Sequence, residues 1–478
     1  KSFDRTFSKV RPPGGTHHGV TLEAKKSLVL YGSSDNSFGT FQQVLKQLDD
    51  YKKLFISPEI IHAAPQTFLD NIANGLGKNS PVWNDELYLE NHRGTYTTRG
   101  RIKKNNRRSE SRISTAEKLA SAAAFMGFTY PRQELEDAWK LILTNQSLPV
   151  LSGASYAPVY RDAMEFYKRA AGKIKKVENN ALAHIAQKIN TALIKEGTPL
   201  FVFNPLSWRR SDFVTVDYPA AHGGDVKLLN IDGNEVPVEI KDDRENGRLT
   251  ISFIAENIPA VGYKLYSIVE AVQERAAAPL AEQRTGTGRA VKARRALPTS
   301  SRNLRKKTRN LRVSAQGHTL ENKFYKIKID ANTGNIKRLF DKVLNREFVA
   351  EGKQANVLQV YEDRPEKWDA RNIGYTGRVW ELDRADSIDI VTESPVRAVL
   401  RVKKSFLGLS KTRVRPTEHY PSSFFTQYIT LYRDLDRVDI ETEADWWEEH
   451  MFLKAAFPVN VNSDNAAYEI PFAAIDRP

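Results

Sequence analysis

The densest group of reactive side chains lies in residues 81–110, which read PVWNDELYLENHRGTYTTRGRIKKNNRRSE. If the ELYLENH portion is extended, Leu87 and Leu89 share one face, because side chains alternate along an extended chain. The opposite face then carries two carboxylates, a phenol and an imidazole, from Glu86, Tyr88, Glu90 and His92. Such groups suit a sugar-binding cleft, where carboxylates bind hydroxyls and aromatic rings stack on C–H faces. The alternative is a solvated polar segment in which His92 is only structural.

A second reactive group is Asp35, which lies in the turn GSSDNSFG. This turn separates an apolar segment, residues 27–32, from residues 41–54, whose apolar spacing is helical. The predicted order is therefore strand, turn and helix, and ligand-binding groups of such α/β units usually lie in the turn after the strand. Asp35 is a candidate acid or base, and the alternative is a turn-forming carboxylate that accepts local hydrogen bonds.

The elements that must hold these groups begin with a helical region from about Thr97 to Glu196. Its alanine-rich stretch STAEKLASAAAFMGF predicts a helix capped by Ser114 or Thr115. A second helix is predicted to begin at Pro131, and residues 157–195 form one long helix or two. Three helices joined by short connections predict an antiparallel bundle.

After Gly197 the sequence becomes typical of β-structure. Short segments rich in β-branched and aromatic residues are separated by turn residues, and GNEV and NTGN are candidate hairpin turns. In residues 324–329 lysines alternate with isoleucines, as expected for a half-buried strand. This half of the chain predicts one or two large antiparallel β-sandwich domains.

The net charge of +14 is concentrated in one segment of the 478-residue chain. Residues 272–312 contain twelve Lys or Arg and two Glu, a net charge of +10, so the other 437 residues carry about +4. The segment lacks periodic apolar residues, which predicts a basic flexible linker or insertion rather than a docking tail for an anionic surface. Nucleic acid is therefore not an expected partner.

Other compositional features exclude several classes of protein. There is no cysteine, which excludes disulfides, iron–sulfur clusters and thiol nucleophiles. No apolar run approaches the eighteen residues or so of a membrane-spanning helix, and no signal peptide is visible. The sequence predicts a soluble protein without a membrane partner, and it leaves compartment and oligomeric state open.

Taken as a string, ELYLENHRGTYTTRG closely resembles the E-L-Y-x-E-x-H-R-G-T-Y-T motif of the family 38 α-mannosidases, in the bacterial and vacuolar branch. These are zinc-dependent retaining glycoside hydrolases, in which this motif leads into a three-helix bundle beside the active site. Further segments resemble the family in the same order: NQSLPVLSGASYAPVYRDA, LFVFNPLSWRR, TLENKFYKIKIDANTGNIKRLFDK and DWWEEHMFLKAAFPV. The resemblance covers nearly the whole chain.

The resemblance implies roles for particular residues. Glu90, His92, Arg93 and Tyr96 would contact an α-mannoside, and the alternative is that they anchor the first bundle helix. Asp35 matches the candidate acid/base of the family's Y-G-x-G-D-H-G-G-G-P-T segment, although Asn36, Ser37 and Phe38 replace the residues that follow it. Retaining hydrolysis requires two carboxyl groups about 5–5.5 Å apart, and only this one candidate remains.

The expected metal site differs from the family pattern. The family binds zinc through a His-x-Asp pair and a nucleophilic Asp, which are expected upstream of Lys1, and through the His of N-Q-F-H-D. Here Leu148 occupies the position of that last His, and leucine has no lone pair for a metal. We therefore expect no metal ligand and no cofactor in this chain as given.

These observations predict a multidomain α+β protein of the α-mannosidase family, N-terminally incomplete or diverged. The predicted parts are the C-terminal part of an α/β glycosidase domain (1–80), a three-helix bundle (81–198), a first β-domain (199–271), the basic linker (272–312) and a large β-sandwich domain (313–478). The implied ancestral activity is zinc-dependent retaining hydrolysis of terminal α-D-mannosides, which this chain alone is expected to lack. The alternative is a non-catalytic glycan-binding or structural protein derived from the family.

Overall fold

The computed structural model describes residues 46, 49–50, 53, 61, 63–73, 92–219, 226–243, 247–270, 312–314, 318–406, 422–470 and 473–477. Its contacts divide the chain into two units, Lys1–Tyr88 and Leu89–Pro478. In the first unit, α3 (Pro65–Ala73) is described, and residues 46, 49, 50 and 53 of the predicted helix are helical. The predicted strand at residues 27–32 lies outside the described residues, as do Asp35, Glu90 and residues 272–311 of the predicted linker.

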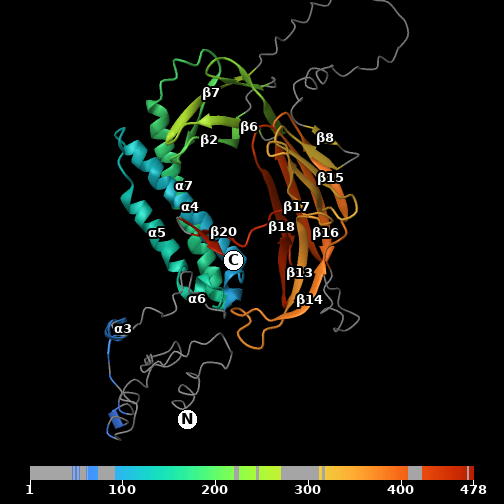
Figure 1. Ribbon diagram of the computed structural model, residues 1–478. Coiled ribbons are helices and arrows are strands. Elements are labelled where there is room, and N and C mark those ends of the chain that lie inside the picture. Colours follow the sequence, from blue (N-terminus) through green and yellow to red (C-terminus); the bar gives the residue numbers. More distant parts are fainter. Residues whose placement is uncertain are drawn as a thin grey trace, which may run out of the picture. The chain divides into compact units, whose positions relative to one another are not determined.

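The second unit begins with helices. After the short 3₁₀ helix η1 (Arg93–Tyr96) come three long helices and one short one: α4 (Gly100–Ala124), α5 (Arg132–Asn145), α6 (Leu148–Leu151) and α7 (Ala157–Lys188). The long helices lie side by side (Figure 1) and share a core that includes Ile113, Ile142 and Ile174, none more than 1% exposed. Three packed helices were predicted, and residues 157–188 form one helix rather than two.

The predicted helix cap at Ser114 or Thr115 is wrong. Both residues lie inside α4, where the Thr115 hydroxyl donates to the carbonyl of Ser111 at 3.0 Å. The helix begins fourteen residues before Ser114, at Gly100, and buries Ile102, Asn106 and Ser109 along one face. Because two of these three buried residues are polar, the apolar periodicity that marks a helix is absent from this stretch of sequence.

Two antiparallel sheets follow and enclose one core. The first sheet has the order β1 (Thr198–Asn204), β7 (Gly262–Glu270), β3 (Val226–Asn230) and β4 (Glu235–Val236). The second has the order β2 (Arg210–Pro219), β6 (Arg248–Ile258) and β5 (Val238–Asp243). Their facing sides bury Leu228, Ile251 and Phe253, as in a β-sandwich. The predicted turn at GNEV joins β3 to β4, with Gly233 at a φ of 79°.

The C-terminal region forms a larger sandwich. One sheet contains β12 (Arg346–Glu347), β11 (Ile336–Asp341), β10 (Tyr325–Ile329), β9 (Thr319–Glu321) and β8 (Arg312–Ser314). It packs on a sheet made of β15 (Ser387–Glu393), β16 (Arg397–Phe406), β17 (Ser423–Tyr432) and β18 (Val438–Asp445), through a core that includes Ile327, Leu400 and Ile429. The predicted NTGN hairpin joins β10 to β11. The alternation in β10 is confirmed, since Ile327 and Ile329 are buried and Lys328 is exposed.

A third sheet and a hairpin complete the chain. The sheet has the order β14 (Tyr375–Glu381), β13 (Val357–Asp363) and β19 (Met451–Ala456), and the hairpin pairs β20 (Ala466–Ile470) with β21 (Ala473–Arg477). The fold of the described residues is therefore α+β with antiparallel sandwiches, as predicted. None of the described helices is long and apolar enough to cross a bilayer.

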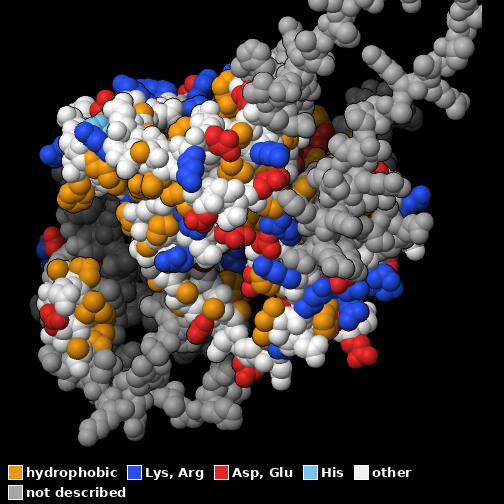
Figure 2. All heavy atoms as spheres, turned by 90° about the horizontal axis from the view of Figure 1, so that it is seen from above, with side chains coloured by type: hydrophobic (Ala, Val, Ile, Leu, Met, Phe, Trp, Pro, Cys, Tyr) orange, Lys and Arg blue, Asp and Glu red, His pale blue; other side chains and the backbone are white. Residues whose placement is uncertain are grey.

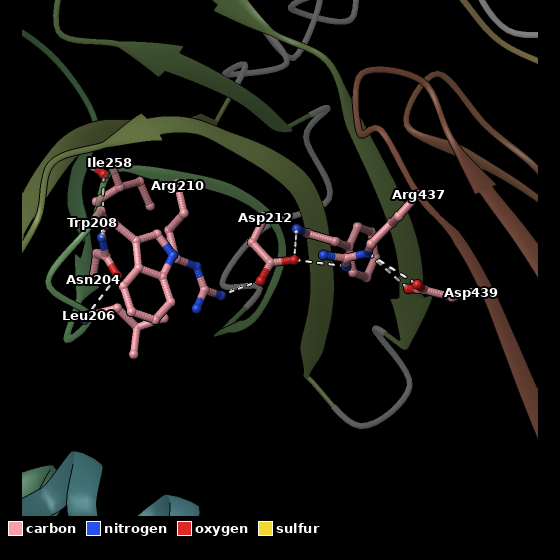
Figure 3. Close-up of polar contacts among 9 residues, drawn as sticks. Asn204, Leu206, Trp208, Arg210, Asp212, Ile258, Arg437 and Asp439 are labelled. Carbon is pink, nitrogen blue, oxygen red and sulfur yellow. Dashed lines mark hydrogen bonds and ion pairs between the residues drawn. The ribbon is translucent and has the colours of Figure 1, made fainter. Parts of the chain in front are cut away.

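Polar contacts fix the turn and the junction that follow the bundle (Figure 3). In the NPLSW segment the buried Asn204 donates to the carbonyl of Trp208 at 2.8 Å, and its side-chain oxygen accepts the N–H of Leu206. Further along β2, Asp212 accepts a hydrogen bond of 2.8 Å from Arg437, which precedes β18. This ion pair connects the first β-sandwich to the second.

Candidate functional site

The RGTY segment of the opening motif docks on a loop of the C-terminal region. The N–H of Gly94 donates to the carbonyl of Arg371 at 2.9 Å, and the N–H of His92 donates to Asn372 Oδ1 at 3.2 Å. A β-carbon on Gly94 would lie 3.0 Å from the carbonyl oxygens of both Arg371 and Asn372. The close approach of the two backbones therefore favours glycine at this position, since any β-carbon would push the two carbonyl oxygens away.

Hydrogen bonds within the motif hold His92 in place. His92 has a left-handed backbone with a φ of 66°, and its carbonyl accepts from the hydroxyl of Thr95 at 2.6 Å. The hydroxyl of Thr98 donates to the carbonyl of Gly94 at 2.8 Å. Lys103 donates to the carbonyls of Thr98 and Leu151, and burial lowers the pKa of its ammonium group. The motif is therefore a rigid turn that is tied to α6.

The docking loop, residues 364–376, is closed by its own backbone. The N–H of Arg364 donates to the carbonyl of Gly374 at 2.7 Å, and the N–H of Gly374 donates to Asp363 Oδ1 at 2.6 Å. Asn372 also donates from Nδ2 to the carbonyl of Lys367 at 2.8 Å. The side chain of Asn372 therefore connects the loop to His92 and braces the loop itself.

A buried carboxylate supports the base of this loop. Glu362 is 6% exposed and accepts hydrogen bonds from Arg364 Nε and from the hydroxyl of Thr376, each at 2.8 Å. The hydrogen bond from Arg364, followed by that from Thr376, lowers the pKa of Glu362. The ionised Glu362 thus holds both ends of the loop.

Between the motif and the loop lies an open pocket of about 940 Å³. Its lining includes His92, Arg93, Trp368, Asn372 and Tyr375. Trp368 is 65% exposed and has a φ of 60°, so its indole is presented to solvent from a constrained backbone. An aromatic residue, a histidine and an arginine around one space can give a small polar ligand both apolar and polar contacts at fixed positions.

The structure brings together two of the residues predicted from the sequence, His92 and Arg93. Tyr96 lies in η1 and is 73% exposed, but it is not part of the pocket lining. Sequence reasoning missed the other wall, which includes Trp368 and Asn372. A signal was present in RPEKWDARNIGYTG, where a tryptophan and a tyrosine lie in a polar loop with proline and glycine.

A second pocket, of about 580 Å³, lies beside β7. Its lining includes Tyr263, Lys264, Val396 and Arg433, and it contains no residue of the opening motif. The larger pocket at His92 is the better candidate, because it joins the motif to an exposed tryptophan on a braced loop.

The described residues do not fit the zinc site of the family. Among them, no three His, Asp or Glu side chains are placed to hold one metal ion. Leu148, at the position of the family's metal-binding His, begins α6 and is 77% exposed. Its hydrocarbon side chain offers no donor atom.

Two family profiles match the chain on either side of the pocket. The alpha mannosidase middle domain matches residues 90–185, which include the RGTY turn and the helices. The C-terminal domain of glycosyl hydrolases family 38 matches residues 320–478, which include the docking loop. The chain belongs to glycoside hydrolase family 38. The family's middle and C-terminal domains thus provide one wall of the pocket each.

Individual relatives agree with this assignment. The chain is 26% identical to alpha-mannosidase 2C1 of Mus musculus over 486 residues, which cover 99% of this chain and 38% of the mouse protein. It is 22% identical to an alpha-mannosidase of Saccharomyces cerevisiae, covering 98% of this chain and 37% of the yeast protein. The chain therefore spans less than half the length of these relatives.

The fold is also similar to that of solved family 38 structures. An alpha-mannosidase from Enterococcus faecalis V583 is similar with a TM-score of 0.67 and 17% identity, over 91% of this chain and 52% of that chain. A family 38 protein from the same species gives a TM-score of 0.65 over 91% of this chain and 53% of that chain. The arrangement of helices and sheets is thus shared despite low sequence identity.

Proposed function

We propose that this family 38 chain binds α-mannosides in the pocket between the RGTY turn and the loop of residues 364–376. The observation that carries the proposal is the direct fixing of His92 by Asn372, which places a family-motif residue beside the exposed Trp368. The identity of the relatives as alpha-mannosidases supports the choice of sugar.

The groups of the pocket suit distinct parts of a pyranose. The exposed indole of Trp368 offers a flat apolar surface for the C–H face of the ring. Arg93 and His92 offer donors to ring hydroxyls, and Glu366, which also lines the pocket, offers an acceptor. Glu90 and Tyr96 remain proposed sugar contacts of the motif, and Asp35 remains the proposed acid/base.

We further propose that the chain binds the sugar without hydrolysing it. Retaining hydrolysis requires a nucleophilic carboxylate about 5–5.5 Å from the acid/base. A proton donor without that second carboxylate gives little turnover. Leu148 favours the same conclusion, since it removes one ligand of the family's metal. These residues therefore best support a non-catalytic, glycan-binding role.

Binding is tested by titrating the full chain with methyl α-D-mannoside and measuring heat by calorimetry. We expect Trp368→Ala and His92→Ala each to weaken binding about tenfold, equivalent to about 1.4 kcal/mol. The matched control is Trp208→Ala, which removes an indole that is 58% exposed outside this pocket. Equal weakening by the control, or no saturable binding by the unmodified chain, would contradict the proposal.

Hydrolysis is tested separately with an aryl α-mannoside and added zinc. We expect no zinc-dependent turnover from the unmodified chain. Turnover would show that the metal site and both carboxylates are present, and would restore an enzymatic function. Turnover only after Leu148→His would show that the chain provides the remaining metal ligands and the nucleophile.

A further inference from the structure

A smaller groove, of about 220 Å³, lies on the seam between α4 and α7, two helices that lie side by side (Figure 1). Its lining includes three cations and no carboxylate. The polar lining residues are Asn105, Arg108, Ser109 and Arg112 of α4, and Tyr167 and Lys168 of α7. The groove therefore offers donors and positive charge, which suits an anion.

Ser109 is a largely buried residue whose hydroxyl lines this groove. The residue is 6% exposed, and its hydroxyl makes no hydrogen bond to any residue that the structure describes. A serine inside a helix commonly satisfies its hydroxyl by bonding to the carbonyl four residues earlier, as Thr115 does with Ser111. Ser109 Oγ is not among the fully buried side-chain atoms without a partner, so it is accessible from the groove and its hydroxyl can donate to a ligand there.

The cations around the groove are only partly neutralised by the protein. Arg112 pairs with Glu178, and Lys168 lies 3.8 Å from Glu165, but the Lys168 and Glu165 side chains are 78% and 64% exposed. An exposed pair of this kind is weak. Arg108 has no carboxylate partner within the described part of the chain, and neither do Arg101 and Lys104, which lie seven and four residues before it on the same face of α4.

The Lys and Arg residues near the start of α4 do not stabilise that helix. The first nine residues of α4 contain five Lys or Arg and no acid, namely Arg101, Lys103, Lys104, Arg107 and Arg108. Cations in the first turn of a helix oppose its dipole, and Arg101 and Lys103 lie in that turn, so these two cost stability. The face shown in Figure 2, by contrast, has acidic and basic side chains intermixed. A bound anion would offset the repulsion among the cations of α4.

We propose that the α4–α7 groove binds a tetrahedral oxyanion, the phosphate or sulfate of a free ion or of an esterified sugar. Ser109 Oγ donates a hydrogen bond from the floor, and Arg108, Arg112 and Lys168 supply charge-assisted contacts from both helices. The site is separate from the pocket at His92 and does not depend on the function proposed for it.

The proposal is tested by thermal unfolding of the full chain in rising inorganic phosphate, with ionic strength held constant by sodium chloride. We expect a saturable rise in Tm. The double variant R108Q/K168Q should weaken the apparent affinity about tenfold or more, as expected for loss of charged hydrogen bonds. The control K118Q/K188Q removes the same charge from exposed positions of α4 and α7 outside the groove and should leave the affinity within about twofold.

Ser109→Ala distinguishes a specific binding site, with a hydrogen bond from Ser109, from non-specific attraction of the anion to positive charge. Alanine is a good helix former, so the variant should keep the Tm of the unmodified chain in chloride while weakening phosphate binding about threefold or more. Unchanged affinity in Ser109→Ala, or equal loss in K118Q/K188Q, would overturn the proposal. Sulfate and a hexose phosphate are titrated in parallel: tighter binding of the ester identifies a phosphorylated sugar as ligand, and equal affinity identifies the free anion.

Discussion

Arg397 donates two hydrogen bonds to Glu239, from Nε to Oε2 at 3.0 Å and from Nη2 to Oε1 at 2.8 Å, although 158 residues separate them. Ser394 donates a third to Oε2, and the Arg397 guanidinium lies 4.7 Å from the ring centre of Phe213. The hydrogen bond to Glu239 is the main cause that raises the pKa of Arg397. Together with Asp212 and Arg437, this pair joins the two β-sandwiches.

Glu239→Ala should destabilise the second unit by about 2 kcal/mol, because it leaves a half-buried guanidinium without its carboxylate. Urea unfolding followed by circular dichroism measures the change. Glu136→Ala, which breaks the exposed pair with Arg132 on α5, is the control and should change the midpoint little. Equal losses of unfolding free energy in the two variants would show that the Glu239–Arg397 pair stabilises the protein no more than an exposed ion pair.

Gly94→Ala should lower the unfolding free energy by about 1–3 kcal/mol, because the added β-carbon meets two carbonyl oxygens at 3.0 Å. Gly172→Ala is the matched control, since nothing lies within 4 Å of a β-carbon there and Gly172 is inside α7. That variant should stabilise the protein by about 0.5–1 kcal/mol. The prediction fails if both substitutions shift the midpoint in the same direction.

Stability should rise with pH because of Lys404. This lysine is 1% exposed in the C-terminal sandwich, donates to Asn335 and to the carbonyl of Leu382, and has its pKa lowered by burial from 10.5 to about 8. Below pH 8 both folded and unfolded chains carry the proton, so the folded chain bears the full cost of a buried charge. Between about pH 8 and 10.5 the unfolded chain binds more protons, and the cost disappears as pH rises.

Lys404→Met should therefore increase the unfolding free energy at pH 7 by up to about 3 kcal/mol, with a smaller gain at pH 10. The measurement is urea unfolding of both proteins across this range. If the difference between them does not change with pH, Lys404 keeps an ordinary pKa in the folded chain.

Asn372 should act as a positioning residue for the proposed sugar pocket. Asn372→Leu removes both of its side-chain hydrogen bonds, and we expect binding of methyl α-D-mannoside to weaken about five- to tenfold. Asn372→Asp keeps the acceptor for the His92 N–H, so it should recover part of the affinity. An Asp variant as weak as the Leu variant would show that the acceptor does not position His92.

Much of the fold could be predicted from local sequence. The hairpin at NTGN needs glycine, since Gly334 has a φ of 70° and a β-carbon there would lie 2.4 Å from Val402 Cγ1. The alternation in β10 and the apolar faces of α5 and α7 could also be predicted from the spacing of their apolar residues. The start of α4 was not, because its buried face carries Asn106 and Ser109 in place of apolar residues. Asn106 donates to Glu110 within the helix and accepts a hydrogen bond from Gln146, 40 positions away, which local sequence does not reveal.

The candidate site could be predicted only on one side. His92 and Arg93 belong to a compact motif that sequence resemblance identifies. Trp368 and Asn372 belong to a loop that contacts Gly94 through Arg371 and His92 through Asn372, and no local pattern records these tertiary contacts. The division of the chain into domains at residues 80, 198, 271 and 312 stays a prediction.

The separation of 280 positions between His92 and Asn372 has a consequence for biosynthesis. At about 5–20 residues per second, the ribosome adds the second wall of the pocket tens of seconds after the first. During that interval the N–H groups of His92 and Gly94 lack their native acceptors, so they can be hydrated instead. The pocket is therefore completed only late in translation, and a chain that stops before residue 364 would present the motif without a pocket.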